Sequence, residues 1–237
     1  MKIGKVSYNG TSSDSLGIFL SGSGTYNAAE LDATAYEIPG RNGDLIIPNN
    51  RYKNIEVTYP AFVPNDFETR VQAVRNWMRS AEGYKKIEDN YDSTHYRMGM
   101  GVGVLEFTPA QINRAANLQL VFNCKPQRFL KTGDTAVNPS SGATISNPTQ
   151  YDAKPEISFK NPTSSATLTI GSITVTATSA YTGVVVIDCE TQNIYSGSNN
   201  LNSYFNVTNF PVLKPGNNTI TYSGVTNVTV IPHYWEL

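Results

Sequence analysis

Short runs of alternating apolar and polar residues, separated by turn-forming dipeptides, fill most of this chain. In one such run Ile55, Val57 and Tyr59 fall on the same face, as expected for a strand with one buried side. Asn9-Gly10 and Asn42-Gly43 predict tight hairpins, because both central residues of a type I′ turn need a positive φ that Asn and Gly tolerate. The pattern predicts a mainly β protein.

One segment has helical periodicity instead. Asn65 and Glu68 have the spacing of a capping box, and Gly83 is a plausible stop. The apolar residues between these signals recur at i, i+4, i+7 and i+11 and are Phe67, Val71, Val74 and Met78. A helix with a single apolar stripe packs on a sheet, so we expect this stripe in the core and not at an interface.

The second half of the chain is predicted to be all β. Residues 131–154 are rich in Thr, Ser, Gly, Asn and Pro, as in a linker or a long surface excursion. Beyond them, Gly171-Ser172 can form a type II′ turn, and Val184–Ile187 has the β-branched composition of a central strand. We therefore expect an N-terminal domain over residues 1–133, a linker over 134–154, and a C-terminal β-sandwich over 155–237.

Composition excludes several classes of function. The chain has 237 residues, 18 Lys+Arg against 19 Asp+Glu, and a formal net charge of -1. It lacks the basic excess that phosphate neutralisation needs, so we expect no nucleic-acid ligand. No apolar run reaches membrane-span length, and the N-terminus lacks the apolar region of a signal peptide. Cys124 and Cys189 lie in apolar alternating segments and are expected to be buried free thiols.

Catalytic residues are scarce. His95 and His233 lie in different predicted domains, and neither has metal-ligand spacing with a cysteine or the other histidine. Glu88, Asp89 and Asp92 could form a carboxylate pair of a glycoside hydrolase or a calcium site, but they do not fit the EF-hand spacing. A solvated turn is the simpler interpretation. We expect no catalytic residue, no cofactor and no metal.

Aromatic residues are dense in the C-terminal half and leave two alternatives open. Exposed rings in a plane can stack on sugars, whereas buried rings supply core area in a small sandwich. We favour the core for these residues: Tyr181, Tyr195, Tyr204, Phe205, Phe210, Tyr222, Tyr234 and Trp235.

Four ordered blocks of residues stand out in the first half of the chain. They are Asn9-Gly10 with Leu16-Gly17; Pro39-Gly40-Arg41-Asn42-Gly43; Trp77 with Gly83-Tyr84 and Asp89-x-Tyr91-Asp92; and Phe122-x-Cys124-Lys125-Pro126-Gln127-Arg128-Phe129-Leu130. In this order and spacing the blocks resemble the distal tail protein (Dit) family of long-tailed siphophages. Three further blocks in the second half also look like the family: Pro155-x-Ile157, Ile187-Asp188 with Tyr195, and Phe210-Pro211-x-Leu213-x-Pro215-Gly216-x-Asn218.

The resemblance implies a structural role in the virion. Members form a hexameric ring at the tail tip, built by an N-terminal β-sandwich that carries one α-helix and a β-hairpin extension clasping the neighbour. Their C-terminal domain is a galectin-like or carbohydrate-module-like β-sandwich. The implied partners are the other copies of the homohexamer, the major tail (tube) protein, the tail-associated lysin or baseplate hub protein, the tape-measure protein and, in many tails, a receptor-binding protein. DNA passes through the channel without sequence-specific binding, and the protein is made in the host cytoplasm.

This chain is too short to contain the carbohydrate-binding modules that longer relatives insert, so a docking surface is the favoured role of the second domain. The alternative function is a carbohydrate-binding module for host-wall attachment. A cell-wall hydrolase is the third hypothesis. Exposed hairpins are natural carriers of subunit contacts. The interface candidates are Pro39, Gly40, Arg41, Asn42 and Gly43 in one segment, and Gly99, Met100, Gly101, Val102 and Gly103 in a second, glycine-rich one.

Overall fold

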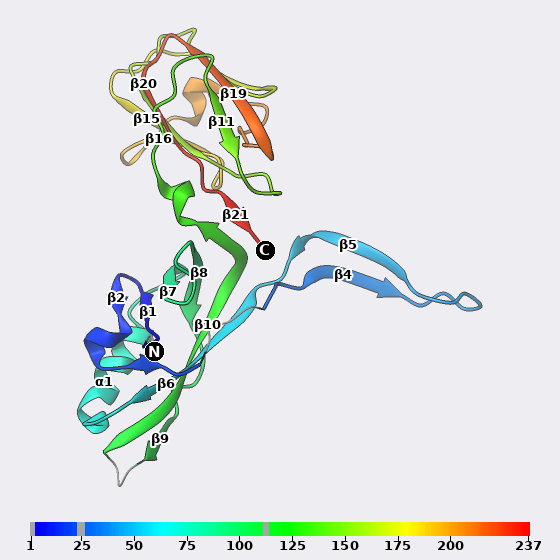
Figure 1. The fold of residues 1–237 in the computed structure, drawn as a ribbon. Helices are drawn as coiled ribbons and strands as arrows, with labels where there is room; N and C mark the ends of the chain where they lie inside the picture. The colour runs from blue at the N-terminus through cyan, green and yellow to red at the C-terminus, as the bar shows by residue number, and fades with distance from the viewer. Residues whose placement is uncertain (1–2, 23–26, 111–113) are drawn as a thin grey trace. The chain divides into compact units, whose positions relative to one another are not determined.

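The computed structural model describes residues 3–22, 27–110 and 114–237, without the side chain of Phe67 (Figure 1). The chain divides into two compact units, Met1–Arg128 with Leu237, and Phe129–Glu236. The boundary falls near the end of the long strand β10, so no separate segment joins the two units. Nearly all regular structure in both units is β, which confirms the fold class predicted from the sequence.

The N-terminal unit is a sheet with one helix. Its strand order is β2-β1-β7-β8-β10-β6-β3, and β9 pairs with β10. A bridge between Gly4 and Leu20 links the start of the chain to β3, so the sheet folds back on itself around one core. The elements are β1 (Val6–Tyr8), β2 (Thr11–Ser12), η1 (Ser13–Leu16), β3 (Phe19–Leu20), β4 (Leu31–Tyr36), β5 (Leu45–Tyr52), β6 (Ile55–Val63), α1 (Phe67–Met78), β7 (Lys85–Asp89), β8 (His95–Gly101), β9 (Phe107–Ala110) and β10 (Ala115–Leu130).

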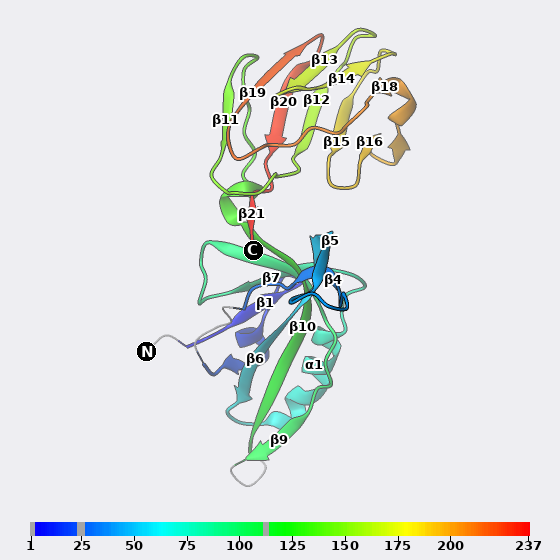
Figure 2. The ribbon, with the colours of Figure 1, turned by 90° about the vertical axis from the view of Figure 1, so that its right-hand side faces the viewer.

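The helix α1 packs on this sheet as its stripe predicts (Figure 2). Val74 and Met78 are buried and Val71 is half-buried, whereas the side chain of Phe67 lies outside the described residues. Trp77 fixes the helix by donating from Nε1 to the carbonyl of Tyr8 at 3.2 Å. The predicted cap at Asn65 is wrong: Asp66 is the N-cap, with φ 52°, and no side chain caps the helix. A left-handed N-cap lacks the extended backbone that side-chain capping uses.

The C-terminal unit is a sandwich of two sheets that share one core. The sheets have the orders β11-β19-β13-β14-β18 and β17-β16-β15-β12-β20. Leu168 and Ile220 come from the first sheet and Phe159 and Ile187 from the second, and all four belong to the same buried cluster. The elements are η2 (Lys131–Asp134), β11 (Thr144–Asn147), β12 (Glu156–Lys160), β13 (Thr167–Ile170), β14 (Ile173–Ala177), β15 (Val184–Asp188), β16 (Asn193–Ser196), β17 (Asn199–Asn200), η3 (Asn202–Tyr204), β18 (Phe205–Asn206), β19 (Gly216–Ser223), β20 (Thr226–Ile231) and β21 (Trp235–Glu236).

The segment 134–154, expected as a linker, contributes to this sandwich. It supplies the edge strand β11, which pairs with β19, and Ala153 forms a bridge with Leu213. In β11 only Ile145 and Asn147 are buried, which explains why the composition looked like that of a linker. The Asn147 amide is fully bonded: it donates to the carbonyls of Tyr151 and Leu213, both at 2.8 Å, and accepts from Thr149.

Several local predictions are confirmed. β15 is central in its sheet, Gly171 has φ 59° in a two-residue hairpin, and Asn9 and Gly10 both have the positive φ of a type I′ turn. Cys124 and Cys189 are free and buried, and burial raises the pKa of each thiol to about 12. Both thiols therefore remain protonated at neutral pH.

Gly101 allows β8 to approach α1. A Cβ at this position would lie 2.6 Å from the Met78 carbonyl oxygen and 2.9 Å from its methyl group. We therefore expect Gly101→Ala to lower the free energy of unfolding by about 1–3 kcal/mol through overpacking. Urea unfolding checks this, with the exposed neighbour Val102→Ala as control, expected to change stability by less than about 0.5 kcal/mol. Equal stability of the two variants would contradict the close approach.

Candidate assembly surfaces

The hairpin formed by β4 and β5, residues 31–52, forms a sheet of its own and is here called the arm (Figure 1). It extends away from the main sheet of its unit, and almost all of its residues are exposed. Six large apolar side chains of the arm face solvent, from 39% exposed for Ile38 to 64% for Ile46; the others are Leu31, Tyr36, Leu45 and Ile47. A concentration of exposed apolar side chains on one element marks an interaction surface.

The base of the arm is held by ionic contacts. Arg51 Nε donates to Asp32 at 2.5 Å, and Lys53 Nζ lies 3.0 Å from Glu30. The hydrogen bond from Arg51 is the main reason that the pKa of Asp32 is lowered. A bulge interrupts the pairing between Asp32 and Ala33, and Asn50 there has φ 55°. These contacts fix where the arm leaves its unit, while its outer part makes no core contact among the described residues.

The first set of sequence-predicted interface residues forms the tip of the arm. Pro39, Gly40, Arg41, Asn42 and Gly43 are all exposed. The hairpin was predicted correctly but its turn type was not, because Gly40 and Gly43 have positive φ and Asn42 does not. Since β4 ends at Tyr36 and β5 begins at Leu45, a wide loop replaces the two-residue turn. An interface role for these residues stays a prediction.

The second set lies elsewhere and is partly buried. Gly99 and Gly101 are buried in β8, Met100 and Gly103 are half-buried, and Val102 is 39% exposed. No strand continues beyond Gly101, where β8 ends, until β9 begins at Phe107. Arg79 holds this segment by donating to the carbonyls of Gly101 at 2.6 Å and Gly103 at 2.8 Å. The glycines thus serve close packing within the unit, and Val102 is the surface residue of the set.

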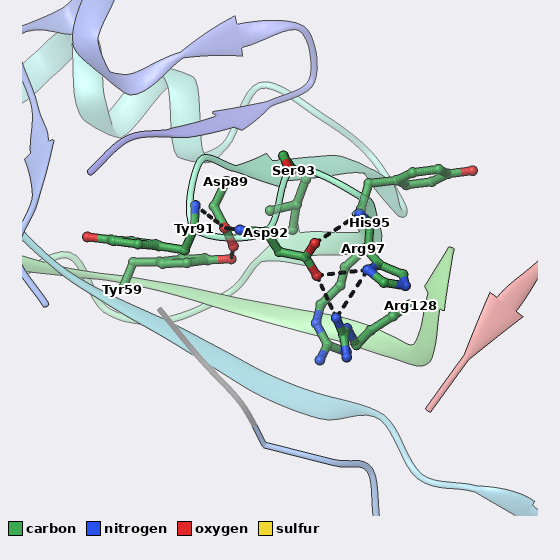
Figure 3. Close-up of a pocket in the computed structure, with 10 residues that line it drawn as sticks. Tyr59, Asp89, Tyr91, Asp92, Ser93, His95, Arg97 and Arg128 are labelled. Carbon is green, nitrogen blue, oxygen red and sulfur yellow. Dashed lines mark hydrogen bonds and ion pairs between the residues drawn. The ribbon is translucent and has the colours of Figure 1, made fainter. Parts of the chain in front are cut away.

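A polar pocket of about 230 Å³ lies beside the ends of β7, β8 and β10 in the N-terminal unit (Figure 3). Asp92 is its centre: its carboxylate accepts from Arg128 at 2.5 Å, lies 2.9 Å from His95 Nδ1, and accepts from the Thr94 backbone and hydroxyl. Burial alone would raise the pKa of Asp92, but the hydrogen bonds from Thr94 and Arg128 outweigh it and hold the pKa well below 3.8.

The second carboxylate of the pocket is also saturated. Asp89 accepts from the Tyr59 hydroxyl at 2.7 Å and from the backbone N–H groups of Tyr91 and Asp92, both at 2.9 Å. Burial and this carboxylate raise the pKa of Tyr59, so the phenol stays protonated. Glu88 instead points to Lys86, 3.5 Å away. Among the described residues no group of three or more acidic, His or Cys side chains is arranged to hold a metal ion.

The association of Asp92 with His95 and Arg128 was not predicted. The expected solvated turn at residues 88–92 is in fact a hydrogen-bonded corner that carries one wall of the pocket. The one sequence signal was that Asp92 and Arg128 stand in two of the family-like blocks, with nothing in the spacing to show that they meet.

The aromatic residues of the C-terminal unit are mostly core. Phe205 and Tyr234 are buried, and Tyr181, Tyr204, Phe210 and Tyr222 pack against the core. Tyr151 and Trp235 form a stacked pair outside this core, with ring centroids 4.3 Å apart. Trp235 is half-buried and braced by a hydrogen bond from Nε1 to the Asp152 carbonyl.

Comparison with known proteins agrees with this architecture. Residues 148–234 match the family described as siphovirus-type tail component, C-terminal domain (SPP1 Dit). The fold is similar to the crystal structure of SPP1 Dit (gp 19.1), with a TM-score of 0.76 and 12% identity over 100% of both chains. It is also similar to a chain of the phage p2 baseplate in its activated conformation, with a TM-score of 0.56 and 8% identity over 97% of each chain. None of the curated proteins compared matches in sequence.

These findings define the class as far as residues 148–234 carry it: a siphovirus-type tail component in sequence, within a chain that has the fold of phage tail and baseplate proteins. The C-terminal unit therefore matches the Dit family in sequence, and the whole chain has the fold of SPP1 Dit. Across the described ranges no helix is long and apolar enough to span a membrane.

Asp92→Asn tests the ionic centre of the pocket. At pH 7 we expect the free energy of unfolding to fall by about 1–2 kcal/mol, allowing for the third of the side chain that water screens. Because the folded-state pKa is depressed, this stabilisation is present above the ordinary carboxyl pKa of 3.8 and is lost as pH falls towards the folded value. Urea unfolding should therefore show the same difference from wild type at pH 7 and pH 5, and a difference that begins to shrink at pH 3.5 and is clearly smaller at pH 2.5.

The matched control is Asp44→Asn, which removes an exposed carboxylate from the arm tip and should have a small, pH-independent effect. An equal effect of Asp92→Asn at pH 7 and pH 2.5 would show that the carboxylate does not act through its charge.

Proposed function

We propose that this protein forms a hexameric ring at the distal end of a phage tail, where it joins the tail tube to the tail-tip or baseplate hub. In this role its ring contacts the tube protein on one side and the lysin or hub protein on the other, and surrounds the end of the tape-measure protein. The C-terminal unit gives a docking platform for host adhesion, including a receptor-binding protein where the tail has one. The protein is a virion component with no catalytic role of its own.

The arm is the observation that carries this proposal. A closed ring needs a heterologous interface, in which one patch of each subunit meets a different patch on the next. The arm offers six exposed apolar side chains on an element with its own two-stranded backbone pairing. Covering these side chains removes apolar surface from water, which is the main favourable term in protein association. A monomer gains nothing from displaying them, so a partner surface explains them best.

The C-terminal unit supports a docking role over sugar binding. Most of its aromatic rings lie in the core or pack against it. Outside the core, the rings of Tyr151 and Trp235 stack on each other. Sugar recognition by stacking needs a ring face open to the ligand. A carbohydrate-binding module is therefore the weaker candidate, and no feature of the described residues favours it.

The double variant Ile46→Asp/Ile47→Asp tests the arm. These adjacent residues point to opposite sides of β5 and are 64% and 47% exposed. We expect the variant to fold with a thermal midpoint close to wild type, because exposed substitutions change stability by less than about 0.5 kcal/mol. Mass photometry should show loss of the assembled species, by at least tenfold, since two charges would have to be buried at the interface.

Val184→Asp is the matched control, because Val184 is 43% exposed and belongs to the C-terminal unit, not to the arm. It should assemble like wild type. If the hub partner is needed to close the ring, the same comparison is made on the co-expressed complex and on tails imaged by electron microscopy. Six-fold rings from the arm variant, or a wild-type monomer that binds cell-wall polysaccharide, would contradict the proposal.

A further inference from the structure

Arg97 is the unusual group in the polar pocket. It lies on β8, 91% of its surface is buried, and its guanidinium lines the same pocket as Arg128 (Figure 3). Its side chain has one hydrogen bond among the described residues, a long one of 3.4 Å to the Asn27 carbonyl. A guanidinium carries five N–H donors and stays charged in proteins, so most of its donors are left to the pocket.

Arg97 forms no ion pair within 4.0 Å among the described residues, and Asp89 acts on it only through its charge at longer range. The two acidic side chains of the pocket are committed elsewhere, Asp89 to Tyr59 and two backbone N–H groups, and Asp92 to Thr94, His95 and Arg128. Burial is the main reason that the pKa of Arg97 is lowered; the Arg128 charge adds to this, whereas Cys124, Tyr59 and Asp89 oppose it without reversing it. A buried charge without a partner is costly, so its retention points to a partner from outside the chain.

We propose that this pocket binds a compact oxyanion, a carboxylate or a phosphate, on the guanidinium of Arg97 with Arg128 as the second cationic wall. Guanidinium groups recognise both anions by paired, charge-assisted hydrogen bonds. The cavity of about 230 Å³ is several times the roughly 30 Å³ share of one water molecule, so it accommodates such a group.

Two sources can supply this chemistry. One is a free anion such as inorganic phosphate, and the other is an acidic side chain of a second copy of this chain. The second source rests on the proposed ring, whereas the first does not. Arg128 is already fixed by Asp92, so the site is pre-organised on one side and open at Arg97.

Thermal unfolding in phosphate tests the site on the full-length chain. Phosphate is compared with sodium chloride at equal ionic strength in a buffer without other oxyanions. We expect phosphate at several times its Kd to raise the Tm by about 2–4 °C over chloride. Arg97→Gln should lose this increment, and in chloride its Tm should equal or exceed that of wild type, because an uncompensated charge has been removed. A structural arginine would instead lower the Tm in both salts.

Arg75→Gln is the matched control, since it removes an exposed arginine from α1 and should keep the full phosphate response. Arg97→Lys keeps the charge without the planar fork and should retain less than half of the increment. This second variant decides the question if Arg97→Gln does not fold.

Self-association measured in the same two salts separates the sources. If the anion is free, phosphate raises the Tm and leaves the assembled fraction unchanged. If it is a carboxylate of a second copy, phosphate and Arg97→Gln each lower the assembled fraction, and Arg75→Gln does not. Absence of any Arg97-dependent phosphate effect on Tm and assembly overturns the site, even where rings form. If phosphate raises the Tm through Arg97 but no rings form, the anion site is supported and the proposed ring is contradicted.

Discussion

In the N-terminal unit β10 runs for 16 residues, and nine of them, Ala116–Cys124, pair in register with β6. The even-numbered residues of this range are buried and the odd-numbered ones are not, so a slip of one residue would turn the core face to solvent. The same strand then carries Arg128 to the pocket, beside residues of β7 and β8. Core, helix contact and pocket therefore depend on one register, and the close approach of Gly99 to Cys124 Sγ reinforces it.

The arm differs from the rest of the N-terminal unit, because its apolar residues do not belong to the hydrophobic core. Its strands pair with each other, its base is tied by Arg51 and Lys53, and its apolar residues face outward. An isolated two-stranded hairpin is marginally stable in water at best. In the proposed ring, the neighbouring subunit would complete the conformation of the arm and so couple its folding to assembly.

Sequence patterns predicted what local periodicity determines. The alternation in β6, the stripe of α1 and the hairpin at Asn9-Gly10 follow from residues close in the chain, and the structure has all three. Leu45-Ile46-Ile47 shows the limit of local patterns. The same apolar run would be expected in a buried strand, but here it lies in an exposed arm. Asp92 and Arg128 are 36 residues apart and meet only through the sheet, so no local pattern could have placed them together. The polar edge strand β11 was missed because two buried residues are too few to mark it.

The low charge of the chain, 16% of residues, acquires a physical meaning in this arrangement. Surfaces covered by partners lose water from every charge they contain, so an assembling subunit benefits from having few charges and from pairing those it buries. Asp92 and Arg128 satisfy each other within the chain, and Arg97 is the exception. The exposed apolar side chains of the arm supply contact that is strong but non-directional, whereas a guanidinium needs an anion in one geometry. In the proposed ring, the arm would supply the strength of the association and Arg97 its register, because a non-directional apolar contact tolerates small shifts and a guanidinium hydrogen bond does not.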